Sequence, residues 1–167
     1  MDTSPELRVS PTRGAMTIGA ATAALMLAFS VVGWPVMGWL VFVGGVFYGM
    51  YIYKKALGGT IGYSKALNVG AQTAFFTSLI MAFVGYMSTT LDPSSLAAML
   101  DVAEQQLRTS GIHEVLVEMA MQQWREILSP VVFALIIIFM YSMAGTFISI
   151  VFAFFVRNAK PGKFAEN

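Results

Sequence analysis

Residues 131–156 read VVFALIIIFMYSMAGTFISIVFAFFV, and this stretch decides what kind of fold the chain can have. It contains no Asp, Glu, Lys, Arg or His over 26 residues. As an α-helix it would be about 39 Å long. The hydrocarbon core of a bilayer is about 30 Å thick. We therefore expect a membrane-spanning helix that tilts or projects beyond the hydrocarbon.

Three further stretches are free of charged residues and about as long as a membrane span requires: Ala15–Val32, Pro35–Tyr53 and about Ala66–Met87. Helices satisfy their own backbone groups in lipid, whereas the alternating segments of about ten residues that build a β-barrel are absent here. The sequence predicts an all-α polytopic membrane protein with four transmembrane helices. The predicted transmembrane domain covers residues 15–157, between an N-terminal tail at 1–14 and a C-terminal tail at 158–167.

The N-terminal stretch, Ala15–Val32, also resembles a secretory signal, with a weak cleavage site at Ala28–Ser30. We expect it to be retained as a span. The turn after it, Gly33–Trp34, is very short. The first two spans are therefore predicted to form a tight antiparallel hairpin, with Pro35 at a helix start where a missing N–H costs nothing.

Composition supports a membrane protein and excludes several other classes. The chain of 167 residues is 57% hydrophobic and 11% charged, against about 25% charged in ordinary soluble domains. A formal net charge of +1 argues against nucleic-acid binding. There are no cysteines and one histidine, which excludes disulfides and thiolate chemistry and leaves no histidine-rich metal site.

Basic residues gather on one side of the predicted spans, as cytoplasmic segments do. With both termini in the cytoplasm, eight of the ten fall on that side: Arg8, Arg13, Lys54, Lys55, Lys65, Arg157, Lys160 and Lys163. The other two, Arg108 and Arg125, lie in residues 90–128 with six of the nine acidic residues. We therefore expect cytoplasmic N- and C-termini and an extracytoplasmic segment 90–128.

Residues 51–65, YIYKKALGGTIGYSK, contain glycines and lysines but do not match a phosphate-binding P-loop. That loop needs GxxxxGK followed by Ser or Thr between a strand and a helix. We interpret the segment as a cytoplasmic turn in which glycines permit the reversal and Ser64 caps the third span. Its lysines, Lys54, Lys55 and Lys65, are candidates for contact with a lipid phosphate.

This turn also carries a resemblance to a known family. The residues concerned are Lys54–Lys55, Gly58–Gly59, Gly62–Leu67 and, before the last span, Ser129–Pro130. With the N-terminal hairpin and the acidic segment rich in Gln and Met, they make the chain, from the first span to about Val156, resemble the DUF4199 family of unknown function. These are small four-span membrane proteins found mainly in Bacteroidetes. The resemblance implies a bacterial inner membrane and supplies no catalytic or binding residues.

Residues 90–128 are predicted to form two amphipathic helices. Asp92 caps the first, which begins at Pro93. A break at residues 109–111 precedes the second, which we expect to start near Ser110 or Gly111 and to lie on the outer leaflet or cap the bundle. Its expected apolar face is Ile112, Val115, Leu116, Met119, Ala120, Trp124, Ile127 and Leu128.

Two sets of residues in this segment have the chemistry of metal ligands. Glu114 and Glu118, with Asp101, Glu104 or His113, have the ligand chemistry for a divalent cation, but a solvated acidic helix face explains them better. The methionines Met99, Met119 and Met121 are better explained by apolar packing than by copper binding. We therefore predict no metal and no cofactor.

Small and polar residues inside the spans favour helix packing. Gly19 with Ala23 and Gly45 with Gly49 are spaced to let helices approach closely, either between the first two spans or between two copies. Asn68, Gln72 and Thr146 are polar residues inside the predicted spans. They could line a hydrophilic path, but bonds between helices or to their own backbone explain them better.

These observations leave two functions open. The first is a non-enzymatic accessory or scaffold subunit that packs with itself or another membrane protein, in contact with membrane lipid. The second is a lipid-related carrier, or a glycosyltransferase-associated factor, that assists the handling of polyprenyl-linked sugars. An enzyme is the weakest hypothesis because the sequence offers no nucleophile–base pair or carboxylate dyad.

Overall fold

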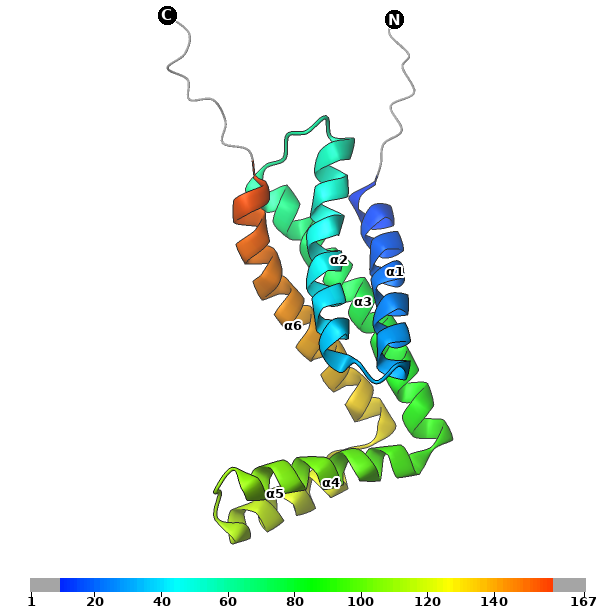
Figure 1. The fold of residues 1–167 in the computed structure, drawn as a ribbon, viewed down its shortest axis with the longest axis vertical. Helices are drawn as coiled ribbons and strands as arrows, with labels where there is room; N and C mark the ends of the chain where they lie inside the picture. The colour runs from blue at the N-terminus through cyan, green and yellow to red at the C-terminus, as the bar shows by residue number, and fades with distance from the viewer. Residues whose placement is uncertain (1–9, 158–167) are drawn as a thin grey trace, which may run out of the picture. The chain divides into compact units, whose positions relative to one another are not determined.

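The computed structural model describes residues 10–157, and all of their regular structure is helical. The six helices are α1 (Pro11–Val31), α2 (Pro35–Ala56), α3 (Tyr63–Leu91), α4 (Pro93–Thr109), α5 (Glu114–Ile127) and α6 (Pro130–Val156) (Figure 1). Four of them, α1, α2, α3 and α6, are long and apolar enough to cross a membrane. The prediction of an all-helical chain with four such helices is confirmed.

The described chain divides into two compact units. Unit 1 contains residues up to Ser78 and from Met140 onward, so it holds α1, α2 and the adjoining parts of α3 and α6. Unit 2 is Leu79–Phe139 and holds α4, α5 and the remaining parts of α3 and α6. Most of both predicted tails, together with Arg8, Lys160 and Lys163 of the sidedness prediction, lie outside the described residues.

Helices α1 and α2 form the predicted tight hairpin. The hydroxyl of Ser10 accepts a hydrogen bond from the Arg13 amide at 3.1 Å, so α1 is capped and begins at Pro11 rather than at Ala15. Gly33 reverses the chain with a φ of 81°, a conformation open to glycine at little cost. The next helix then starts at Pro35 as expected.

The turn between α2 and α3 uses glycines as predicted, but its helix start differs. Gly58 and Gly59 adopt φ angles of 75° and 88°. Helix α3 begins at Tyr63, and the Ala66 amide bonds the Gly62 carbonyl at 3.0 Å. Ser64 therefore lies inside the first turn of α3 and is not its N-cap.

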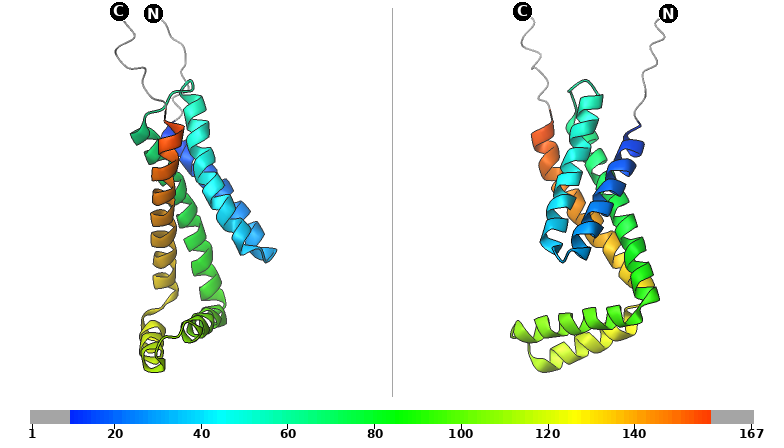
Figure 2. Two further views of the ribbon diagram at one scale, coloured as in Figure 1. Left: turned by 60° about the vertical axis from the view of Figure 1, so that its left-hand side comes forward. Right: turned by 45° about the vertical axis from the view of Figure 1, so that its right-hand side comes forward.

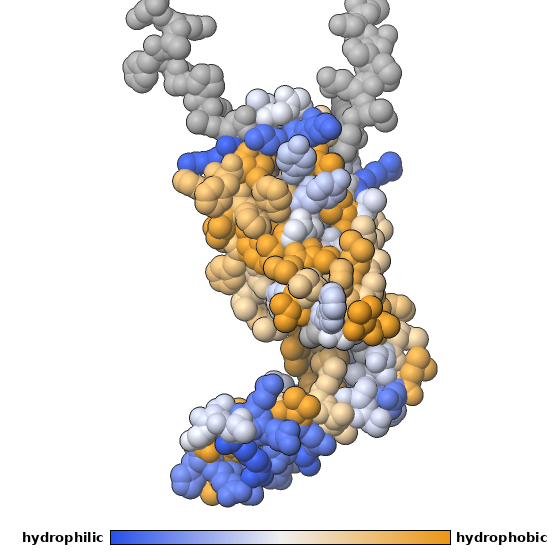
Figure 3. All heavy atoms as spheres, in the orientation of Figure 1, coloured by the Kyte–Doolittle hydropathy of each residue, from blue (hydrophilic) through white to orange (hydrophobic). Residues whose placement is uncertain are grey.

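Apolar and aromatic side chains fill unit 1. Phe42, Val46 and Met50 lie on one face of α2 and are fully buried. Trp39 stacks on Tyr141 of α6, with ring centroids 5.4 Å apart, and Phe42 meets the same tyrosine edge-on. In Figure 3, apolar side chains cover most of the visible face of unit 1, while hydrophilic ones gather at the end where α2 ends. This is the surface expected of helices embedded in lipid.

In unit 2, α4 and α5 lie side by side as a helical hairpin (Figure 2). The Asp92 carboxylate accepts bonds from the Ser94 amide and hydroxyl, and α4 begins at Pro93, so the predicted cap is confirmed. The second helix starts later than expected, at Glu114. The reason is that α4 continues to Thr109 and Gly111 then turns the chain with a φ of 76°.

The buried face of α5 also differs from the expected one. Val117 and Met121 are buried, although the predicted apolar face omitted both. Val115 and Met119, which that face included, are exposed. The expected face lay about a third of a turn from the buried one, because periodicity alone does not say where a neighbouring helix will pack.

Candidate functional site

The basic end of unit 1 holds the three lysines predicted to meet a lipid phosphate, and the structure separates their roles. The Lys54 ammonium donates a hydrogen bond to the Val156 carbonyl oxygen at 2.9 Å. Carbonyls at the C-terminus of a helix lack partners within it and favour a positive charge. Lys54 therefore neutralises the end of α6, whereas Lys55 and Lys65 are exposed.

A cation that sequence reasoning did not single out lies at this end of unit 1. The Arg157 guanidinium sits over the Phe154 ring, 4.3 Å from its centroid, which is cation–π geometry. Beside it is a groove of about 460 Å³, lined by Arg157, Tyr63 of α3 and the apolar residues Ile150, Val151, Phe154 and Phe155 of α6. The signal in the sequence is an arginine three residues after a phenylalanine at the end of a span.

Close helix contacts form at the predicted small residues, but mostly with α3. A Cβ on Gly19 would lie 2.9 Å from the carbonyl oxygen of Thr73 in α3. One on Gly49 would lie 2.7 Å from the hydroxyl of the same threonine. Of the three glycines, Gly45 alone makes its nearest contacts within the α1–α2 hairpin, at Thr22 of α1. Ala23 is fully buried.

Two further close contacts join α3 to α6, and sequence reasoning missed both. A Cβ on Gly70 would lie 2.5 Å from the Ser149 hydroxyl, and one on Gly145 would overlap the methyl of Ala74. The residues follow a small-xxx-small spacing on each helix, at Gly70 with Ala74 and at Gly145 with Ser149. That spacing was the signal available in the sequence.

Most hydroxyl side chains of the spans bond to backbone carbonyls. Thr77 donates to the carbonyl of Gly19 in α1 at 3.2 Å and to that of Thr73 at 2.9 Å. Thr146 bonds the Ser142 carbonyl of its own helix at 2.7 Å. Asn68 is exposed. The Gln72 side-chain oxygen is buried without a hydrogen-bond partner among residues 10–157.

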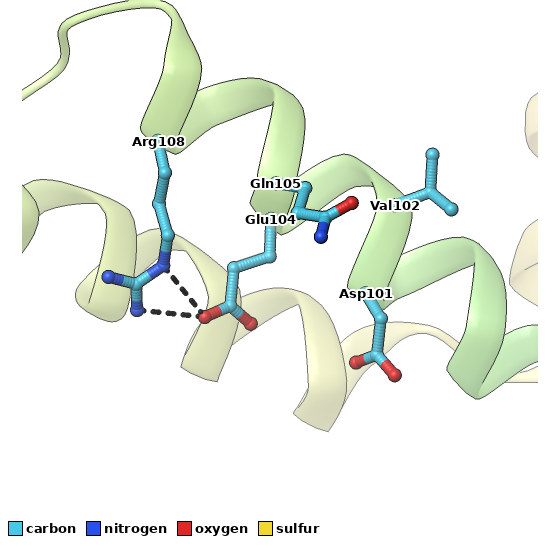
Figure 4. Close-up of a pocket in the computed structure, with 5 residues that line it drawn as sticks. All are labelled: Asp101, Val102, Glu104, Gln105 and Arg108. Carbon is cyan, nitrogen blue, oxygen red and sulfur yellow. Dashed lines mark hydrogen bonds and ion pairs between the residues drawn. The ribbon is translucent and has the colours of Figure 1, made fainter.

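The acidic residues of the α4–α5 hairpin are engaged by arginines. Arg108 bonds Glu104 and Glu114, with its shortest contacts at 2.9 and 2.7 Å, and Arg125 contacts Glu104 and Asp101 at 3.0 and 3.4 Å. Figure 4 shows the Arg108–Glu104 pair at an open depression of about 330 Å³ on α4. The hydrogen bonds that Arg108 donates to Glu104 and Glu114 raise the pKa of its guanidinium, which stays charged at every physiological pH.

Three of the carboxylates with the ligand chemistry for a divalent cation, Asp101, Glu104 and Glu114, pair with arginines. Over the described part of the chain, no three His, Cys, Asp or Glu side chains are grouped in a way that would hold a metal ion. Each arginine pairs with two carboxylates, and these ion pairs connect α4 to α5.

The fold and these contacts define a class: an all-helical chain with four bilayer-sized apolar helices, compatible with a multi-pass membrane protein. The family model for a protein of unknown function, DUF4199, matches residues 14–158. The chain belongs to the DUF4199 family, in agreement with the sequence resemblance. No curated protein and no solved structure matches the chain.

Proposed function

We propose that this chain is a non-enzymatic protein of the bacterial inner membrane that acts as an accessory or scaffold subunit. It packs with a second copy of itself or with another membrane protein. Its N- and C-termini are cytoplasmic, and α4 and α5 are amphipathic helices outside the membrane core. The observation that carries the proposal is the divided surface of the α4–α5 hairpin.

One part of the hairpin surface is charged, and its arginines and carboxylates form ion pairs with one another. The visible face in Figure 3 is mostly hydrophilic, and its arginines bond carboxylates of the hairpin itself. The other part of the surface is a row of exposed apolar residues on α5. Leu116, Trp124 and Ile127 recur at helical spacing and are 59%, 47% and 61% exposed. An exposed apolar patch beside charged residues is typical of an interaction surface.

The interior of unit 1 supports a structural role over a catalytic one. The hydroxyls of Thr73, Thr77 and Ser149 donate to backbone carbonyls, so they reinforce the helices instead of facing a general base. Glycines bring α1, α2 and α6 against α3 at distances that leave little room for substrate.

The partner surface predicts a variant that separates binding from folding. Leu116→Glu places a charge in the apolar row of α5 and should abolish the oligomer or stoichiometric complex seen by native mass spectrometry of mildly solubilised membranes. Gln105→Glu adds the same charge at an exposed position of α4 and should leave the complex intact. A wild-type chain that is monomeric and without a partner would contradict the scaffold role.

The proposed sidedness predicts an all-or-none labelling pattern. Because the chain has no cysteine, Lys55→Cys and Gln105→Cys each introduce a single thiol at an exposed position. In intact spheroplasts, a membrane-impermeant maleimide should label the Gln105→Cys variant and reach the Lys55→Cys variant only after permeabilisation. The reverse pattern would invert the topology.

The lipid-related carrier is a second candidate, and the groove beside Arg157 is the observation that favours it. An exposed basic end with Lys55 and Lys65 suits the phosphate of a polyprenyl-linked sugar. Lys54 contributes less to this role because it already bonds the Val156 carbonyl. The carrier role requires that a polyprenyl phosphate outcompete a diacyl phospholipid for the purified chain, and equal binding would remove its basis.

A further inference from the structure

The groove between Tyr63 and the end of α6 combines apolar walls with a single cation. Its volume of about 460 Å³ lies within the range of about 300–1,000 Å³ that is usual for small-molecule pockets. Val151, Phe154 and Phe155 are all more than half exposed. Over the most apolar 18 residues of α6, only 6% of the residues are buried, so most side chains of this stretch are accessible to lipid.

The cation of the groove retains its capacity for an anionic ligand. Arg157 contacts the Phe154 ring face, and such a contact leaves the N–H groups at the edge of the guanidinium available for hydrogen bonds. The ion pairs found among residues 10–157 all join side chains of α4 and α5, and none involves Arg157. The negative end of the α6 dipole, which would weaken an anion site, is offset by Lys54 at Val156.

The surroundings of the groove add charge of the same sign. Lys54, Lys55 and Arg157 all lie at the end of unit 1 where α2 and α6 finish. Tyr63, the first residue of α3, contributes a phenol at the rim. An occupant must therefore be apolar along its length and anionic at one end, and it must be abundant where α6 meets lipid.

We propose that this groove binds one anionic glycerophospholipid. Its phosphate lies between the Arg157 guanidinium and the Tyr63 hydroxyl, and an acyl chain runs along Ile150, Val151 and Phe154. The guanidinium matches a phosphate because its donors are planar and forked. This site goes beyond the scaffold role and does not depend on it, since the scaffold surface lies on α5.

The test is a lipid titration of the full chain in zwitterionic detergent, followed by native mass spectrometry. The probes are dioleoyl phosphatidylglycerol and dioleoylglycerol, which share acyl chains and differ in the phosphate headgroup. We expect one phosphatidylglycerol to be retained, bound at least about tenfold more tightly than dioleoylglycerol, because hydrogen bonds to charged groups are among the stronger ones. Equal affinity for the two lipids would overturn the proposal.

Matched variants locate the binding. Arg157→Gln should reduce phosphatidylglycerol binding to the level of dioleoylglycerol, whereas Arg13→Gln removes the same guanidinium at an exposed position of α1, outside the groove lining, and should change it less than about twofold. Tyr63→Phe should weaken binding by about threefold. Tyr48→Phe removes a phenol from the groove between α1 and α2 and should have no effect. Equal losses for the Arg157 and Arg13 variants would show that binding depends on the overall positive charge and would overturn the site.

A further variant keeps the result interpretable if Arg157→Gln disturbs the end of α6. Val151→Trp fills the groove from an exposed position and leaves the guanidinium in place. It should lower the affinity for both lipids. Retention of both at wild-type affinity would place the bound lipid elsewhere and overturn the proposal.

Discussion

Replacing Gly145 with leucine should prevent α3 and α6 from packing, and replacing it with alanine should lower the thermal unfolding midpoint by several degrees. Gly145 is buried where three helices meet. A Cβ at this position would overlap the Ala74 methyl of α3 and lie 3.1 Å from the Phe42 ring of α2. Overpacking a well-filled interior costs about 1–3 kcal/mol, and a leucine adds more volume than these neighbours can yield.

The measurement is fluorescence-detected size-exclusion chromatography after heating in mild detergent. Gly44→Ala is the matched control, because Gly44 is exposed on α2 and a Cβ there would meet nothing within 4 Å. Since alanine is the better helix former by about 0.5–1 kcal/mol, this control should be unchanged or slightly more stable. A Gly145→Ala variant as stable as the Gly44→Ala control would refute the close approach of α3 and α6.

The contact at Gly145 also predicts a rescue. The obstacle is the side chain of Ala74, so Ala74→Gly in the Gly145→Ala background moves one methyl from α3 to α6 without changing the total volume. The double variant should recover most of the lost stability, because residues in direct contact do not contribute additively. Simple addition of the two single losses would mean that another contact limits the packing.

Replacing Gly19 with alanine should destabilise the bundle at least as much, and no side-chain substitution should restore it. A Cβ on Gly19 would lie 2.9 Å from the Thr73 carbonyl oxygen and 3.2 Å from the Thr77 amide nitrogen. Both are backbone atoms of α3 and cannot rotate away, so α1 must move. That movement also breaks the hydrogen bond from the Thr77 hydroxyl to the Gly19 carbonyl. We expect a loss at the upper end of the range of about 1–3 kcal/mol for overpacking.

Hydrogen exchange of α1 peptides, measured by mass spectrometry, should accelerate in the Gly19→Ala variant together with the fall in the unfolding midpoint. Gly14→Ala lies in the same helix, and its Cβ would meet nothing within 4 Å. It should exchange at the wild-type rate. A Cβ on Gly19 would also lie 2.9 Å from the Cβ of Phe76, which alanine would keep and only glycine removes. Recovery of Gly19→Ala stability by Phe76→Gly would show that the Phe76 Cβ, and not the α3 backbone, is the obstacle.

Much of the architecture follows from local features that a sequence displays directly. The long apolar stretch at residues 131–156 predicted a bilayer-sized helix, and α6 covers Pro130–Val156. Asp92 before Pro93 predicted a capped start, which the structure contains. The glycines of residues 51–65 predicted the turn after α2, and Gly58 and Gly59 adopt φ angles of 75° and 88° there. Each of these features acts within a few residues of itself, so its effect is readable without knowing the neighbours.

The candidate site was only partly predictable for the opposite reason. The lysines at residues 54–65 indicated a basic end, but the groove at that end is made by Tyr63 and by α6, far apart in the sequence. A lysine in a sequence does not reveal whether its ammonium group will donate a hydrogen bond to a backbone carbonyl, as Lys54 does to Val156. Arg157 became a site residue through its place beside Phe154 and the groove.

Sequence alone thus determined how many helices are long and apolar enough to cross a bilayer and where the chain turns between them. The reason is that hydropathy, capping and glycine conformations act over a few residues. Tertiary structure alone decided that Gly19 and Gly49 meet α3, that Val117 and Met121 are the buried residues of α5, and that Lys54 bonds the Val156 carbonyl of α6. A small or apolar helix face specifies that a neighbour can approach, and only packing selects which neighbour does.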